Sequence, residues 1–185
     1  MAHRIHLFGA SGSGTTTLGR ALAERLQCKH FDSDDFYWQP SASPFSCRRP
    51  RDERIQRLQS QVLSQPRWVL SGSLCGWGDV LIPSFTLAVF LQLDPDVRLR
   101  RLRAREFQRY GVQIFEGGER HAATQAFLAW AAGYDEGDHG TRSRRRHETW
   151  IKSLACPLVR LDSTRLSVPA LCERLLEVLD HSSMA

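Results

Sequence analysis

The segment Gly9–Thr16, which reads Gly-Ala-Ser-Gly-Ser-Gly-Thr-Thr, most narrowly limits what this chain can fold into. It follows the short β-prone run Arg4–Phe8. It precedes a segment whose apolar residues recur at helical spacing, namely Leu18, Ala21, Leu22 and Leu26. A strand, a glycine-rich loop and a helix in this order are the context that a phosphate-binding loop requires.

The spacing Gly9-x-x-x-x-Gly14 followed by Thr15-Thr16 matches the Walker A pattern, except that Thr15 stands where the pattern has lysine. Such a loop binds phosphate because its backbone N–H groups converge and the following helix adds its positive end. We expect the phosphates to be bound by Gly9, Ser11, Gly12, Ser13, Gly14, Thr15, Thr16 and Thr17. The Thr16 hydroxyl would also ligate Mg²⁺. The cation that normally reaches the β- and γ-phosphates is missing.

Two other interpretations of the loop remain open. It could be a plain glycine-rich turn between a strand and a helix. A dinucleotide-binding fingerprint fits less well, because its third glycine would fall at Thr17.

The composition favours an anion-binding protein without a membrane segment. Only two of the 25 basic residues are lysines, Lys29 and Lys152, which leaves 23 arginines, and the net charge is +5. Guanidinium groups bind phosphates and carboxylates bidentately, so this charge suits a polyphosphate site as well as nucleic acid. No apolar run approaches the roughly 18 residues of a membrane span, so we expect a cytoplasmic protein. Five scattered cysteines indicate reduced thiols.

Strand and helix signals alternate along all 185 residues, which predicts one α/β domain with a parallel sheet. The predicted strands span about 4–9, 28–32, 67–71, 86–93 and 157–161. The predicted helices include about 51–65, a helix that begins after Asp94-Pro95, and about 168–179 with Ser167 as its cap.

Carboxylates follow the second predicted strand, at Asp32, Asp34 and Asp35. Ligands of parallel sheets bind beyond the carboxyl ends of the strands, so one carboxylate could hold Mg²⁺ and another could orient or deprotonate an acceptor hydroxyl. An acidic turn that caps the next segment is the alternative. The third strand ends in Ser71-Gly72, whose small side chains would let a ligand approach.

Arginines gather in two places. Arg98, Arg101, Arg105 and Arg109 form a stripe on the helix after Asp94, which could be a functional or merely a solvated face. Arg142, Arg144, Arg145 and Arg146 follow a glycine- and aspartate-rich segment, and we interpret them as a mobile clamp. No histidine has the spacing of a zinc ligand.

With these motifs in place, the chain resembles the adenylate-kinase-like nucleoside and small-molecule kinases over nearly its whole length. It is similar to bacterial proteins described as adenylate kinases or P-loop ATPases, and to the DNA topology modulation proteins. The run Phe31–Asp34 also looks like the Asp-x-Asp of shikimate-kinase-like enzymes.

The resemblance implies a three-layer P-loop NTPase fold with a five-stranded parallel sheet in the order 2-3-1-4-5. It implies an acceptor-binding region over about 33–65, a lid over about 110–145, and ATP with Mg²⁺ as donor. Asp32 would help to hold the metal, Asp34 would contact the acceptor, and Arg165 would lie near adenine. Three departures are Thr15, Ser71 in place of an aspartate, and the lack of an arginine soon after Gly72.

The first hypothesis is therefore an ATP-dependent phosphotransferase in which Arg142 and Arg145 supply the charge that Thr15 lacks. The second is a nucleotide-binding regulator without turnover. No recognition-helix, RRM or zinc-finger pattern supports nucleic-acid binding. We expect a small molecule or a nucleotide as partner, and the sequence indicates neither the acceptor nor the oligomeric state.

Overall fold

The computed structural model describes residues 3–41, 44–137 and 142–183, and its five strands form one sheet. The strands are β1 (Arg4–Gly9), β2 (Lys29–Asp32), β3 (Trp68–Ser71), β4 (Leu87–Gln92) and β5 (Leu158–Asp162). Across the sheet they run β2-β3-β1-β4-β5, and every neighbouring pair is parallel. The predicted α/β P-loop fold with strand order 2-3-1-4-5 is confirmed, and each predicted strand end lies within one residue of the observed one.

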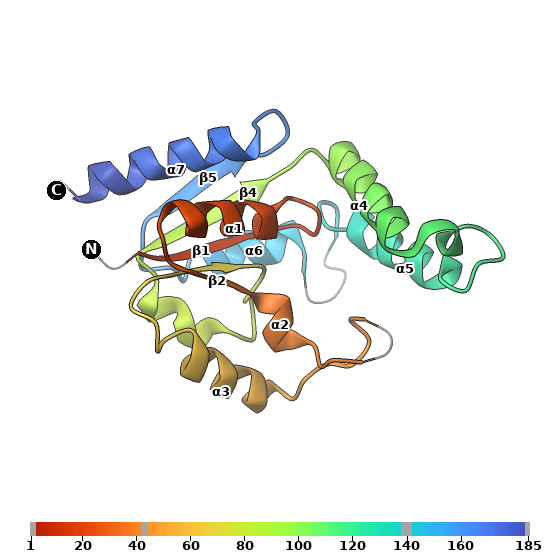
Figure 1. Ribbon diagram of the computed structural model, residues 1–185, viewed down its shortest axis with the longest axis horizontal. Helices are drawn as coiled ribbons and strands as arrows, with labels where there is room; N and C mark the ends of the chain where they lie inside the picture. The colour runs from red at the N-terminus through yellow and green to blue at the C-terminus, as the bar shows by residue number, and fades with distance from the viewer. Residues whose placement is uncertain (1–2, 42–43, 138–141, 184–185) are drawn as a thin grey trace.

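Helices cover both faces of the sheet, and one helical pair extends beyond it (Figure 1). They are α1 (Thr15–Arg25), α2 (Ser33–Tyr37), α3 (Arg51–Gln61), α4 (Pro95–Tyr110), α5 (His121–Ala132), α6 (Arg144–Ile151) and α7 (Val168–Ser183). Two 3₁₀ helices, η1 (Asp79–Ser84) and η2 (Gly111–Ile114), complete the elements. In Figure 1 the α4–α5 pair lies to the side of the sheet, and we refer to α4, η2 and α5 together as the lid.

The core has two layers because successive side chains of a strand point to opposite faces. On one face, Ile5 and Leu7 of β1 pack with residues of α1 and α7 such as Leu22 and Leu175. On the other face, Phe8 belongs to a cluster with residues of β3, α3, η1 and α6. Every residue of β3 is buried, as expected for an inner strand of a parallel sheet covered on both sides.

Helix ends were predicted less well than strand ends. Asp94 caps α4 as expected, because its side chain accepts hydrogen bonds from the N–H groups of Asp96 and Val97 at 3.0 Å. Helix α3 ends at Gln61 rather than at 65, and α7 continues to Ser183 rather than ending at 179. The segment that follows Gln61 forms turns before a proline, which disfavours a helical residue in front of it.

Helices α2 and α5 were not predicted. Helix α2 has only five residues and begins directly where β2 ends, with Asp32 as its cap. Helix α5 is rich in alanine and has apolar residues around much of its circumference, so it lacks a clear polar face.

Among the described residues, no helix is both long enough and apolar enough to cross a bilayer. All five cysteines are free thiols, which agrees with the expectation of reduced cysteines. Only Cys172 is buried.

Replacing Gly19 with alanine should destabilise the protein, although alanine is normally the better helix former by about 1 kcal/mol. A Cβ at Gly19 would overlap the Ser71 hydroxyl and would lie 2.8 Å from His30 Nε2. We expect Gly19→Ala to lower the free energy of unfolding by about 1–3 kcal/mol in urea titrations. The double variant Gly19→Ala/Ser71→Ala should recover part of that loss. Unchanged or increased stability of Gly19→Ala would contradict this packing.

Candidate active site

The loop between β1 and α1 has a backbone path that its glycines make possible. A Cβ on Gly9 would overlap the carbonyl oxygen of Leu91 in the neighbouring strand β4. Gly12 and Gly14 have φ angles of +86° and +93°, in the left-handed region that other residues rarely adopt. The loop therefore passes close to the sheet and turns sharply into α1.

The start of α1 has the properties of an anion site. No side chain caps this helix, no acidic residue lies in its first turn, and a Cβ on Gly14 would meet only open space. The Ser13 hydroxyl is buried and has no hydrogen-bond partner among the described residues. Uncapped N–H groups beside an open, left-handed glycine suit a bound phosphate, so the residues present fit the predicted ligand.

Thr16 and Asp32 meet at this loop, as the sequence analysis expected. Thr16 Oγ1 donates to Asp32 Oδ2 at 2.6 Å, and the N–H of Asp34 donates to Asp32 Oδ1 at 3.0 Å. A hydroxyl and a carboxylate next to a phosphate site form the oxygen donor set that Mg²⁺ prefers. These two residues fit a Mg²⁺ site.

Ser71, at the end of β3, contacts the backbone of the first residue of α1. Its hydroxyl donates to the carbonyl oxygen of Thr15 at 3.0 Å and lies 2.9 Å from His30 Nε2. Ser71 is fully buried beneath the start of α1. It therefore helps to fix the loop from below.

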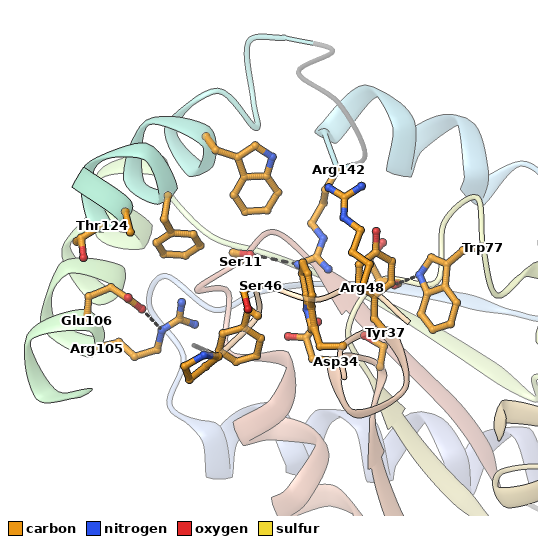
Figure 2. A pocket seen from close by; sticks show the side chains of 18 of the residues that line it. Ser11, Asp34, Tyr37, Ser46, Arg48, Trp77, Arg105, Glu106, Thr124 and Arg142 are labelled. Carbon is orange, nitrogen blue, oxygen red and sulfur yellow. Dashed lines mark hydrogen bonds and ion pairs between the residues drawn. The ribbon is translucent and has the colours of Figure 1, made fainter. Parts of the chain in front are cut away.

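Arg142 lies over the phosphate loop. Its Nη1 donates to Ser11 Oγ at 3.1 Å (Figure 2). The next residue, Ser143, is buried and caps α6 by accepting from the N–H of Arg146. Arg145 lies elsewhere, in a separate hollow of about 350 Å³ that Asp79 and Trp150 also line. The structure thus brings the first of the two predicted arginines to the loop.

Asp34 projects into the same space from the start of α2 (Figure 2). Burial raises the pKa of its carboxyl group above the usual range, and the nearby Arg142 guanidinium opposes that shift. Asp32 adds to the rise. A carboxylate of raised pKa beside a phosphate site is suited to accept a proton.

Ser11, Asp34 and Arg142 line a cavity of about 700 Å³ whose wall also includes residues of the lid. Among the described residues, two carboxylates line it, Asp34 and Glu106. Eight arginines line it, namely Arg48, Arg51, Arg54, Arg105, Arg109, Arg120, Arg142 and Arg146. Seven aromatic residues complete the wall, namely Tyr37, Trp38, Phe45, Trp77, Tyr110, Phe127 and Trp130.

A family model described as an AAA domain matches residues 5–123, which is more than half of the chain. The chain belongs to this AAA-domain family. Uncharacterized protein YqaC of Bacillus subtilis (strain 168) is 42% identical over 183 residues, which are 99% of each chain.

More distant similarities connect this AAA-domain protein with kinases. Cytidylate kinase of Archaeoglobus fulgidus is 29% identical over 114 residues, which are 56% of this chain and 62% of that protein. The shikimate kinase structure from Bacteroides thetaiotaomicron has a TM-score of 0.55 at 21% identity and covers 96% of this chain and 98% of its own. Shikimate kinase from Acinetobacter baumannii in complex with shikimate has a TM-score of 0.58 at 15% identity, with coverage of 100% and 97%. The fold is that of a P-loop kinase.

Sequence analysis missed the basic residues around the start of α3. The guanidinium group of Arg54 stacks on the ring of Tyr37 at 4.4 Å and lies 5.4 Å from that of Trp77. Arg48 and Arg51 line the same part of the cavity. The sequence does contain several arginines between 48 and 57, which could have indicated a basic site. They were not considered because the apolar residues of the helix were used only to predict its buried face.

The arginine stripe of α4 serves several purposes at once. Arg98 is buried, Arg101 donates to the carbonyl oxygen of Ser163, and Arg105 and Arg109 share Glu106 at the cavity wall. A uniformly solvated face is therefore excluded.

The loop after β5 also reaches the phosphate loop. Ser163 Oγ lies 2.9 Å from the carbonyl oxygen of Ser13 and 3.1 Å from that of Gln92, and can donate to either. Arg165, predicted to lie near adenine, is exposed at the end of this loop. Thr17 is exposed in the first turn of α1.

The Arg98–Asp135 ion pair should be essential for the base of the lid. Arg98 is 1% exposed, and its guanidinium donates to the carbonyl oxygen of Ala131 and, at 2.6 Å, to Asp135 Oδ2. Asp135→Ala leaves a buried cation without its counterion, so we expect a loss of about 3 kcal/mol in the free energy of unfolding. In contrast, Glu148→Ala removes an exposed pair with Arg160 and should cost less than about 1 kcal/mol. Equal losses in urea titrations of the two variants would contradict the assignment.

Proposed function

We propose that this protein is an ATP- and Mg²⁺-dependent phosphotransferase that acts on an anionic small molecule or nucleotide. One observation carries the proposal: Ser11 of the phosphate loop, Asp34 and Arg142 line the same cavity, whose wall is rich in arginines. The P-loop kinase fold and the similarity to cytidylate kinases support it.

The donor would bind along Gly9–Thr16, where the backbone N–H groups and the uncapped start of α1 attract its phosphates. The buried Ser13 hydroxyl offers a further partner. Thr16 and Asp32 would hold Mg²⁺, which when bound neutralises charge on the phosphates. The Ser163 loop, which ends at Arg165, would border the adenine.

Arg142 would replace the lysine that Thr15 lacks. Its guanidinium already bonds to Ser11 within the loop, and it comes from the end of the predicted lid region, about 110–145. A guanidinium donates several hydrogen bonds in a plane and stays charged, so it can stabilise the charge that develops on a transferred phosphoryl group. Arg145 lines the separate hollow, so we assign this role to Arg142.

Asp34 would accept the proton of the acceptor hydroxyl. In that step the hydroxyl oxygen bonds to the transferred phosphorus, its proton goes to an Asp34 carboxylate oxygen, and ADP leaves. Asp34 stands at the start of the predicted acceptor-binding region, about 33–65, which also contributes Arg48, Arg51 and Arg54 to the cavity.

The acceptor itself would be anionic. Among the described residues that line the cavity, eight are arginines and two are carboxylates, and Glu106 already pairs with Arg105 and Arg109. Arg54 is half-buried, and its Nε has no hydrogen-bond partner among the described residues. A half-buried cation whose N–H groups lack acceptors is costly, so an anionic ligand is the natural partner. The volume of about 700 Å³ suits a molecule of nucleotide size.

A nucleotide-binding regulator without turnover is the second candidate, and Ser71 favours it, because no carboxylate stands at that position. Purified protein with ATP, Mg²⁺ and a panel of nucleosides, nucleoside monophosphates and small hydroxy acids separates the two. Acceptor-dependent ADP formation supports the phosphotransferase. Calorimetric binding of ATP without ADP formation supports the regulator, and failure to bind any nucleotide contradicts both.

Arg142→Gln should lower kcat by roughly 10³-fold, because arginines in this role contribute about 10³–10⁵. Thr15→Lys in the Arg142→Gln background should restore part of the rate, since it returns a cation to the loop. Arg144→Gln, an exposed neighbour outside the cavity, is the matched control. If Arg142→Gln and Arg144→Gln had similar kcat values, Arg142 would not be the replacement cation.

The pH profile of kcat/KM should reflect the protonation of the Asp34 carboxyl group. Its pKa is raised by burial, and only its ionised form can accept a proton, so activity should rise with pH through a pKa above the usual aspartate range. Asp34→Asn should abolish most activity. Asp35→Asn, on the exposed side of α2, should keep activity and an acid limb, displaced to lower pH because the Asp35 charge also raises the pKa of Asp34. Loss of the acid limb in Asp35→Asn, or its displacement to higher pH, would contradict this assignment.

A further inference from the structure

Three buried side chains form a hydrogen-bonded chain that ends at the cavity. The Tyr134 hydroxyl lies 2.8 Å from His147 Nδ1, and His147 Nε2 lies 2.8 Å from Ser73 Oγ. All three residues are buried, and His147 is completely so. These hydrogen bonds connect three elements: Tyr134 lies in the turn after α5, His147 in the middle of α6, and Ser73 two residues after β3. Of the three, only Ser73 lines the cavity.

The His147 ring is neutral in this environment. The rings of Phe8 and Phe90 meet it edge to face at 5.4 and 5.8 Å, and its two nitrogens face hydroxyl groups rather than carboxylates. Burial lowers its pKa to about 3, and the nearby Arg142 guanidinium acts in the same direction. A neutral imidazole has one N–H donor and one lone pair, so the two hydroxyls must play opposite roles.

Tyr134 determines which nitrogen has the hydrogen. Within the described part of the chain, its hydroxyl has no hydrogen-bond partner other than His147. If Nδ1 were the donor, the phenolic hydrogen would be buried without an acceptor, which buried tyrosines avoid. Tyr134 therefore donates to Nδ1, and the hydrogen of His147 is on Nε2.

This tautomer of His147 determines which hydrogen bonds Ser73 can make. The Nε2–H of His147 donates to Ser73 Oγ, so the serine cannot also donate to that nitrogen. No other partner of Ser73 Oγ exists among the described residues, and its own hydrogen is left over. The backbone beneath it is fixed, because Trp77 Nε1 donates to the Ser73 carbonyl at 2.9 Å.

We propose that Tyr134 and His147 hold Ser73 as a hydrogen-bond donor to the molecule in the cavity, which makes Ser73 a specificity-determining residue. This inference rests on the proposed function, since the molecule is the phosphoryl acceptor. Ser73 selects an acceptor that presents an atom with a free lone pair, such as a carbonyl or hydroxyl oxygen or an unprotonated ring nitrogen. Tyr134 and His147 are positioning residues.

The first experiment measures the tautomer of His147 in the full-length protein without any ligand. Long-range ¹H–¹⁵N spectra of the imidazoles distinguish protonated from unprotonated ring nitrogens, and His147→Gln assigns the signal. We expect hydrogen on Nε2 and a lone pair on Nδ1. Hydrogen on Nδ1 would overturn the inference, whether or not the protein has any phosphotransferase activity.

The second experiment measures affinity for cytidine 5′-monophosphate, a probe with a carbonyl oxygen and an unprotonated ring nitrogen, by calorimetry. Ser73→Ala should weaken binding about 3- to 10-fold, the usual effect of one neutral hydrogen bond. Ser60→Ala, an exposed serine of α3, should leave binding unchanged.

Tyr134→Phe tests whether affinity depends on the tautomer of His147. If Ser73 had only a structural role, this variant would not change the affinity. Tyr134→Phe removes the hydroxyl that donates to Nδ1, so we expect part of the His147 signal to shift to the Nδ1–H tautomer. We also expect weaker binding of the probe, as in Ser73→Ala, although Tyr134 does not line the cavity. Unchanged affinity in both Ser73→Ala and Tyr134→Phe would overturn the specificity role. If the wild type does not bind the probe, the proposed nucleotide acceptor loses support, and the tautomer alone decides this inference.

Discussion

Two serine hydroxyls hold the phosphate loop in its shape, and the rest of the site depends on that restraint. Ser71, at the end of β3, donates to the carbonyl oxygen of Thr15, and Ser163, after β5, reaches the carbonyl oxygen of Ser13. Both hydroxyls take carbonyl oxygens of the loop as partners, so neither occupies the N–H groups at the start of α1. The loop is thus restrained from both sides of β1 before any ligand binds.

A positive charge reaches this loop from a distant part of the chain. A lysine at position 15 would extend from within the loop, whereas Arg142 meets Ser11 from just before α6. The buried pair of Arg98 and Asp135 holds the base of the lid.

Most of the fold could be predicted from the sequence, because hydrophobic periodicity and the glycine spacing are local signals. Strand ends were correct to within one residue, whereas α5 was missed because its apolar residues do not form a stripe. At the site, the sequence pattern indicated the loop and named Thr16 and Asp32 as Mg²⁺ ligands, and the structure joins these two residues by a hydrogen bond. The arginines around the start of α3 could not be predicted, because a basic residue near a helix start is usually solvated.

The sequence by itself determined the parallel α/β architecture and the phosphate loop, since glycine spacing and strand patterning act over a few residues. Only the tertiary structure decided which of 23 arginines reaches the loop, because Arg142 meets Ser11 across 131 positions of the chain. It also decided that Ser71 is buried under α1, and that Ser73, His147 and Tyr134 form one chain of hydrogen bonds. Such contacts depend on how the elements pack, which no local pattern records.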